Sequence, residues 1–269
     1  MVNNIKYEKR IVFFIDILGF KALVEGQQRK KPEDIARILK AIKNLSIKDW
    51  GSRIKIPSKI VTCVSDTVVI SFDYKNPSSL FYAIKAVQEM QNYLIGVEGV
   101  LIRGACALGD LYHSDEMIFG LAMNKACELE KDYAENPRII IPNYIIDIAS
   151  NYSENDGYLG LSEKEHIQKL LKQDVDGYFY IDYISNLAST NAHNIKNHPS
   201  EDFCDGNLLY EFCEENQEWQ SYLIELRKVI AKGLQIENHK IHQKYLWLKE
   251  KYNECIKHLE AYLEVEKVV

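Results

Sequence analysis

Three features are missing from this sequence, and each absence argues against a class of protein. No apolar run approaches the roughly 20 residues that a membrane-spanning helix needs. Basic residues are not in excess, because 33 Lys and Arg stand against 39 Asp and Glu, and the net charge of -6 gives no support to a nucleic-acid partner. A charged segment follows the first few residues directly, which is unlike a signal peptide. We therefore expect a cytoplasmic protein that binds neither membrane nor nucleic acid.

Paired cysteines are also missing. The six cysteines show no C-x-x-C spacing, and several lie in apolar segments, where reduced core thiols are common. They are Cys63, Cys106, Cys127, Cys204, Cys213 and Cys255. His239 and His242 precede the last of them in a polar helix and lack the usual grouping of zinc ligands. Scattered thiols of this kind fit a reducing, cytosolic compartment.

The patterns that are present predict an α+β fold. The hydrophobic content of 46% over 269 residues is enough for a large domain with an appendage. Expected strands lie near 11–16, 59–72 as a hairpin, 100–109, 110–120, 137–142 and 176–183. Expected helices lie near 21–26, 32–47, 76–95, 121–134, 143–153, 214–234 and 238–265. This alternation predicts a ferredoxin-like sheet with helices on one face over residues 8–185. Residues 186–269 are expected to form a polar loop and a helical hairpin, packed on the core or on a partner subunit.

Two acidic residues lie in apolar strand patterns, where a charge is costly. Asp16 follows the apolar run 11–15, and Asp66 lies with Ser65 at the expected turn of the hairpin 59–72. A strand-end acid can be an ordinary solvated turn residue. Two such carboxylates close together repel, and burial penalises both, unless a cation neutralises them. Oxygen ligands suit Mg²⁺ or Mn²⁺, so the pair predicts a metal site.

Four short motifs follow one another over roughly residues 10–142. They are F-I-D-I-L-G-F around Asp16, V-S-D-T around Asp66, L-I-R-G-A around Arg103, and G-L-A-M-N-K-A-C-E-L-E around Asn124. Their order resembles that of the class III nucleotidyl cyclases. In that family the two acids bind metal ions, the arginine contacts phosphate and the asparagine orients the ribose.

The resemblance implies a reaction and a set of ligands. Two Mg²⁺ or Mn²⁺ ions, held by Asp16, Ile17 and Asp66, would promote attack of the ribose 3′-hydroxyl on the α-phosphorus. Backbone N–H groups from Ile17 through Gly19 to Phe20 would cradle the outer phosphates. In the family each site takes its metal ligands from one protomer and its ribose contact from the other. This arrangement implies a symmetric homodimer.

Three positions depart from the purine cyclases. The lysine that reads adenine is replaced by Thr62, the second base-reading residue is Met117, and the transition-state arginine falls at Glu128. This combination resembles the bacterial pyrimidine cyclases of the Pycsar anti-phage systems, as do G-Y-F-Y-I-D-Y at 177–183 and K-Y-L-W-L at 244–248. The resemblance implies cyclisation of UTP or CTP with release of pyrophosphate. The choice between them stays open, because a threonine hydroxyl can donate or accept.

Each candidate residue also has an ordinary structural explanation. Arg103 can be a strand arginine, Asn124 a helix-surface residue, and Glu130 a brace for the core. Since Glu128 reverses the charge of the family's arginine, a second interpretation is a catalytically inactive module that binds a nucleotide or a partner. A diguanylate cyclase relative is disfavoured, because the Gly-Gly-Asp/Glu-Glu-Phe signature is absent from the sequence.

Overall fold

The computed structural model describes seven parts of the chain. They are residues 5–25, 30–43, 58–75, 78–149, 163–185, 206–257 and 267–269, with the backbone alone over 206–218. The chain divides into two compact units. Unit 1 comprises residues 1–91 and 100–181, and unit 2 comprises residues 92–99 and 182–269. Within the described parts, no helix is both long and apolar enough to cross a membrane.

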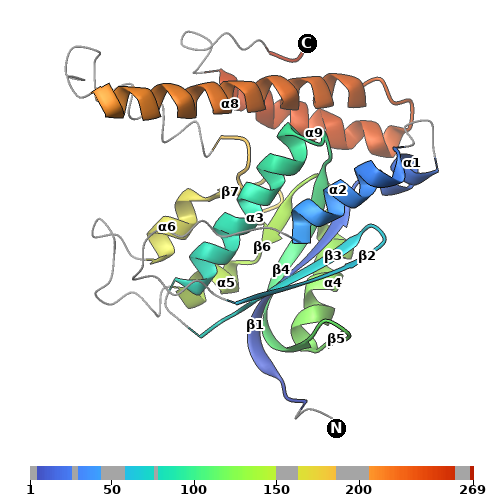
Figure 1. The fold of residues 1–269 in the computed structure, drawn as a ribbon, viewed down its shortest axis with the longest axis vertical. Helices are drawn as coiled ribbons and strands as arrows, with labels where there is room; N and C mark the ends of the chain where they lie inside the picture. Colours follow the sequence, from blue (N-terminus) through green and yellow to red (C-terminus); the bar gives the residue numbers. More distant parts are fainter. Residues whose placement is uncertain are drawn as a thin grey trace. The chain divides into compact units, whose positions relative to one another are not determined.

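Unit 1 is built on a mixed sheet in the order β2-β3-β1-β4-β6-β8-β7, with β5 paired to β4 (Figure 1). The strands are β1 Glu8–Ile17, β2 Lys59–Val64, β3 Thr67–Asp73, β4 Ile102–His113, β5 Ile118–Phe119, β6 Ile139–Ile141, β7 Leu171–Gln173 and β8 Phe179–Ile181. β1 is antiparallel to both β3 and β4, whereas β4 and β6 are parallel. The predicted α+β class is confirmed.

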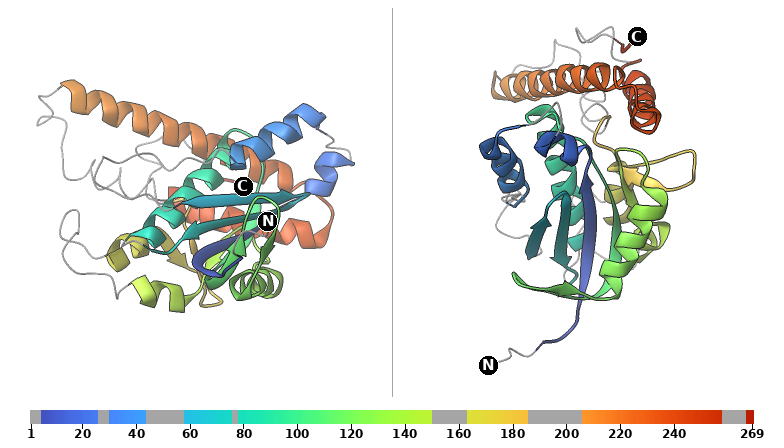
Figure 2. Two further views of the ribbon diagram at one scale, coloured as in Figure 1. Left: turned by 60° about the horizontal axis from the view of Figure 1, so that its bottom comes forward. Right: turned by 90° about the vertical axis from the view of Figure 1, so that its right-hand side faces the viewer.

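Helices cover both faces of this sheet. The helices that begin in unit 1 are α1 Phe20–Val24, α2 Pro32–Lys43, α3 Ser79–Gly96, α4 Leu121–Tyr133, α5 Asn143–Ala149 and α6 Glu163–Lys169. Both views of Figure 2 place α2 and α4 on opposite sides of the strands. Alternate side chains point to opposite faces of a strand, and the successive residues Ile11, Val12 and Phe13 of β1 are all 0% exposed. The sequence predicted helices on one face only, and the structure has helices on the other face as well.

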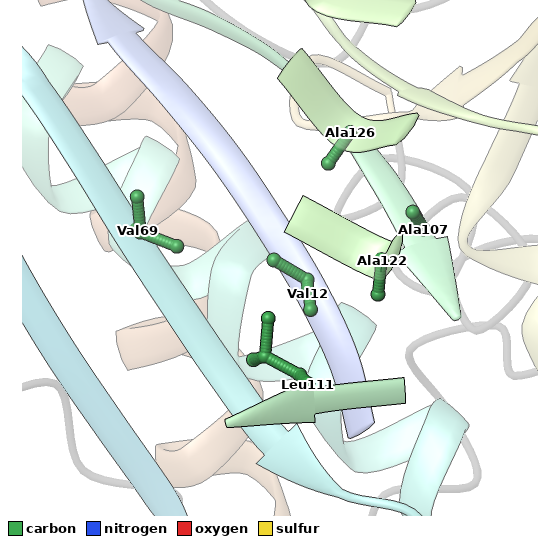
Figure 3. Packing of buried hydrophobic residues seen from close by; sticks show 6 residues of the cluster. All are labelled: Val12, Val69, Ala107, Leu111, Ala122 and Ala126. Atoms are coloured by element: carbon green, nitrogen blue, oxygen red, sulfur yellow. The ribbon is translucent and has the colours of Figure 1, made fainter. Parts of the chain in front are cut away.

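Small side chains bring α4 close to the sheet. Ala122 and Ala126 are four residues apart, so they share one face of the helix. Both are buried against Val12, Val69 and Ala107 in one cluster (Figure 3). With these alanines turned inward, Asn124 and Glu128 of the same helix are exposed. The sequence therefore fixes which face of α4 is presented to solvent.

The predicted boundaries differ most in β4. The sequence predicted a strand at 100–109 and a return strand at 110–120. In the structure β4 continues to His113. β1 already begins at Glu8, and Glu8 pairs with Leu111 in the added part of β4. β5 is only two residues long and pairs with the end of β4. The residues at the start of β1 are polar and give no strand signal, so the sequence did not predict this extension.

The sequence also misjudged the segment after α5. α6 and β7 were not predicted, and β8 covers three residues of the expected strand 176–183. A buried arginine organises this region: Arg138 forms ion pairs with Asp174 and Asp176. Arg138 is 2% exposed, and a buried charge requires such partners. The ends predicted for two helices, at 44–47 and 150–153, lie outside the described residues.

Unit 2 contains two long helices that lie side by side (Figure 1). They are α8 Gly206–Gly233 and α9 His239–Ile256, so the predicted helical pair is confirmed. Asn238 caps α9 by accepting a hydrogen bond from the backbone of Ile241 at 3.2 Å. The Tyr222 hydroxyl donates to the carbonyl of Tyr183 at 2.9 Å. α8 begins at Gly206, within the loop predicted for 186–206 and before the helix start predicted near 214. The rest of that loop, 186–205, and the predicted helix end at 258–265 lie outside the described residues.

We predict that β4 tolerates one glycine substitution and not another. A Cβ at Gly104 would overlap the backbone oxygen of Phe14 and lie 3.2 Å from the Cα of Ile15. A Cβ at Gly109 would meet Ala122 at an ordinary 3.6 Å. Gly104→Ala should lower the free energy of unfolding by about 2–3 kcal/mol, and Gly109→Ala by less than about 1 kcal/mol. Urea unfolding of both variants checks this, and equal losses would contradict the close approach of β1 and β4.

Candidate functional site

Strand register gathers the predicted site residues of the sheet on one face. Asp16 lies opposite Thr67 of β3 and opposite Arg103 of β4. The backbone N–H of Ile17 donates to the carbonyl of Asp66 at 2.9 Å, which ties the hairpin turn to the end of β1. These contacts bring both acids and Arg103 to the same end of three adjacent strands.

Thr62 follows on the same face, further from that end. It lies opposite Val69, which in turn lies opposite Phe14, two residues before Asp16. Residues two apart on a strand point to the same side. The face that α4 covers therefore carries the predicted metal ligand, the predicted phosphate contact and the first predicted base contact.

Arg103 links the sheet to α4. Its Nε donates to Asp16 Oδ2 at 2.9 Å, and its second guanidinium nitrogen lies 3.0 Å from Glu130 Oε1. A third nitrogen donates to the carbonyl of Ala134 at 3.2 Å. Glu130 is 6% exposed, so the alternative in which it braces the core is confirmed. The cation that the sequence required beside Asp16 is supplied in part by Arg103, so the burial of Asp16 does not by itself demand a metal ion.

The donor set still fits a divalent ion that arrives with a triphosphate. Among the described residues, no group of three or more His, Cys, Asp and Glu side chains could hold a metal ion. Mg²⁺ needs only one or two carboxylates, because substrate phosphates and water complete its shell. The side chain of Asp16 is 22% exposed, and Asp66 is half-buried at its turn. Oδ1 of Asp16 and the carboxylate of Asp66 are oxygen donors of the required kind.

The predicted phosphate cradle is narrower than expected. The N–H of Ile17 is used by Asp66, and the N–H of Leu18 donates to the carbonyl of Leu101 at 2.9 Å. Of the predicted segment, this leaves the N–H groups of Gly19 and Phe20. Gly19 has a φ of 75°, a left-handed conformation that favours glycine, and α1 begins directly after it.

A polar network that sequence reasoning missed surrounds Thr62. Thr62 Oγ1 lies 2.9 Å from His113 Nε2, and His113 Nδ1 lies 2.7 Å from Ser71 Oγ. Arg10 Nε donates to the same Ser71 hydroxyl at 2.9 Å. All four side chains lie on the face that carries Asp16, as the register requires. A predicted strand that reached His113 would have placed this residue on the same face as Thr62. The predicted strand ended at 109, so His113 was not considered.

His113 connects Thr62 to the β4–β5 turn, which carries the other predicted base contact. Met117 is 43% exposed, and its carbonyl accepts a hydrogen bond from the N–H of Ser114 at 2.9 Å. Burial, assisted by the nearby Arg10, lowers the pKa of His113 to about 4, while Asp115 opposes the shift. His113 is therefore neutral at pH 7.

Asn124 lies on the exposed face of α4, away from the sheet. Ala122, Ala126 and Glu130 of that helix are buried, whereas Asn124 and Glu128 are exposed. Within one chain, Asn124 and Asp16 are therefore not turned toward each other. The predicted ribose contact requires a second protomer.

No family model matches the chain, and no curated protein matches it. A solved structure that resembles it is the adenylate/guanylate cyclase/hydrolase from Silicibacter pomeroyi, with 16% identity and a TM-score of 0.36. The match covers 65% of this chain and 95% of that chain. A TM-score this low supports no conclusion about the site, which therefore rests on its own geometry.

We predict that His113 makes stability depend on pH. Its ordinary pKa is 6.5, and in the folded chain it is about 4. Between these values the unfolded chain binds a proton that the folded chain does not, so stability falls as pH drops from about 6.5 to about 4. The loss attributable to His113 is at most about 3 kcal/mol.

Urea unfolding across this pH range checks the prediction. His113→Gln should flatten the slope, and the exposed His239 offers a matched control, because His239→Gln should leave it unchanged. If both variants kept the parent slope, His113 would not be held neutral by its surroundings.

Proposed function

We propose that this chain is a nucleotidyl cyclase, which converts a nucleoside triphosphate to its 3′,5′-cyclic monophosphate and pyrophosphate. The observation that carries the proposal is the register that sets Asp16, Asp66 and Arg103 together at one end of β1, β3 and β4. A triphosphate needs a place where divalent cations and donors meet at its phosphates. This strand end offers carboxylates, a guanidinium and the N–H groups of Gly19 and Phe20.

The residues have distinct roles in this proposal. Asp16 and Asp66 would hold Mg²⁺ or Mn²⁺, two ions per site, and the bound ions would acidify the ribose 3′-hydroxyl and screen the triphosphate. Arg103 fixes the orientation of Asp16 by binding Oδ2, so Oδ1 would be the oxygen that binds an ion. The 3′-oxygen attacks the α-phosphorus in line. The bond between the α-phosphorus and the oxygen that bridges it to the β-phosphate breaks, and pyrophosphate leaves.

The proposed substrate is a pyrimidine nucleotide, UTP or CTP. Thr62 and Met117 supply neither the lysine nor the aspartate with which purine cyclases read their base. The residue directly behind Thr62 in the network is a neutral His113, which suits an uncharged base edge. A role of the cyclic product as a second messenger in anti-phage defence follows from the sequence resemblance alone.

The proposed assembly is a homodimer with sites shared between protomers. Asn124 is exposed on α4, on the side opposite to the alanines that contact the sheet. A second chain could therefore receive it at its own strand end. Because one catalytic domain per chain offers one metal half and one ribose half, a symmetric dimer would contain two complete sites.

One observation favours a second function, a catalytically inactive module that binds nucleotide. The guanidinium of Arg103 already contacts the carboxylates of Asp16 and Glu130 and the carbonyl of Ala134, so its charge is matched within the chain. Glu128 moreover stands where the family has its transition-state arginine. Such a module would bind a nucleoside triphosphate without consuming it, which separates the two functions by experiment.

We predict that the purified protein, incubated with each of the four NTPs and Mn²⁺, makes a cyclic pyrimidine monophosphate faster than cyclic AMP or cyclic GMP. Mass spectrometry of the products checks this. Asp16→Asn and Asp66→Asn should each abolish turnover and keep the fold, since the amide preserves shape and removes the charge that holds the ions.

Asp110 provides the matched control, because it is an exposed acid of β4. Asp110→Asn should retain parent activity. Faster purine than pyrimidine cyclisation would refute the base assignment. Tight nucleotide binding without any product would support the inactive module.

We also predict that complementary defects rescue one another. Asn124→Ala and Asp16→Asn should each be inactive alone, because each spoils both sites of its homodimer. After subunit exchange, a heterodimer contains one site with both defects and one site with neither. Mixed protein should therefore regain up to roughly a quarter of parent activity, since half of the dimers are mixed and each has one intact site of two. No regain despite exchange, demonstrated with differently tagged chains, would argue against shared sites.

A further inference from the structure

Four polar side chains form a continuous relay along one face of the sheet. Arg10, Ser71, His113 and Thr62 come from four different strands, β1, β3, β4 and β2, and successive members lie 2.9, 2.7 and 2.9 Å apart. Arg10 is 3% exposed, Ser71 is 0% exposed and His113 is 8% exposed, whereas Thr62 is half-buried. The relay therefore starts in the core and ends at the predicted base contact.

The first bond of the relay has only one possible direction. An arginine side chain has no acceptor, so Arg10 donates and Ser71 Oγ accepts. The hydroxyl proton of Ser71 then needs an acceptor, because a buried donor without one costs free energy. Among the described residues, His113 Nδ1 is the acceptor within reach. Ser71 therefore donates to His113.

This direction fixes the tautomer of the histidine. A neutral imidazole carries one proton, and Nδ1 is occupied as an acceptor, so the proton resides on Nε2. Nε2–H then donates to Thr62 Oγ1. With its oxygen accepting from His113, Thr62 has its own hydroxyl proton left to offer to a ligand.

We propose that this relay turns Thr62 into a hydrogen-bond donor and thereby selects uracil over cytosine. Uracil has an oxygen acceptor at its 4-position, whereas cytosine has an amino group there, which would face the Thr62 proton donor to donor. This inference rests on the proposed function, and it names UTP as the substrate. His113 acts as a positioning residue, because it works through Thr62.

The charges that face His113 keep this polarity in place at pH 7. Arg10 approaches it through Ser71 and disfavours an imidazolium, while Asp115 in the following turn acts in the opposite direction. A doubly protonated ring would need Ser71 to accept from both neighbours and would strand its hydroxyl proton. The buried and positively charged side of the relay therefore favours the neutral ring with Nε2–H.

The tautomer can be measured without any enzymatic activity. In ¹⁵N-labelled protein at pH 7, long-range ¹H–¹⁵N correlation spectra distinguish Nε2–H from Nδ1–H rings. The signals of His113 are those that disappear in His113→Gln. A protonated Nε2 with an unprotonated Nδ1 supports the relay, and the opposite tautomer or a doubly protonated ring overturns it.

The selectivity is measured as the ratio of kcat/KM for UTP to that for CTP. We expect the parent protein to prefer UTP by roughly tenfold or more, the effect of at least one hydrogen bond. Thr62→Val, which removes the hydroxyl at similar volume, should bring the ratio close to one. His113→Gln should do the same, because a glutamine amide can either donate or accept and no longer dictates the polarity of Thr62. His239→Gln should keep the parent ratio.

The outcomes separate this inference from the proposed function. If no NTP is cyclised, the proposed function fails, while the spectra still decide the tautomer. If pyrimidines are cyclised and CTP is used as well as UTP or better, the inference fails and the cyclase stands. If His113→Gln lowers both kcat/KM values equally, His113 is structural only, and its positioning role is rejected. The ratio is decisive here because general damage to the fold would not change it.

Discussion

The pairing of β1 with β3 and β4 is the constraint on which the rest of the site depends. Asp16, Thr62, Arg103 and His113 come from three strands, β1, β2 and β4, and they share one face because each strand is held in a single register. A slip of one residue would turn the whole set to the other face, which is filled by apolar side chains such as Phe13. Burial of the apolar side chains therefore determines the register, and the register in turn brings the polar side chains together on one face.

Arg103 shows how one side chain can serve both stability and chemistry. It neutralises Asp16, reaches Glu130 on α4 and binds a backbone carbonyl beyond that helix. Each buried or half-buried charge thus has a partner, which limits the cost of placing charges near the core. The same contacts engage Oδ2 of Asp16, and the proposed cation would bind Oδ1. A structural ion pair and a ligand for a substrate-bound cation are therefore compatible in the same carboxylate.

Local patterns predicted the strands and helices that are strongly periodic, and non-local pairing decided the rest. The run before Asp16, the hairpin turn at Asp66 and the helix that carries Asn124 were all found, because their apolar spacing is regular. The end of β4 was missed, since the polar start of β1 that pairs with it gives no strand signal by itself. His113 was missed for the same reason. The ion pair of Asp16 with Arg103 joins residues 87 positions apart, and no local pattern reports such a contact.

The parallel pairing of β4 with β6 has a consequence for how this protein can evolve. Two parallel neighbours require the chain to cross a face of the sheet between them, and α4 is that crossing. The strong preference of such crossings for one hand leaves the helix a single face to occupy. Its inward alanines pack against the sheet, whereas exposed side chains such as Glu128 do not. Mutation can therefore change what α4 presents to solvent without moving the helix, so descendants of this chain could acquire new associations on an unchanged scaffold.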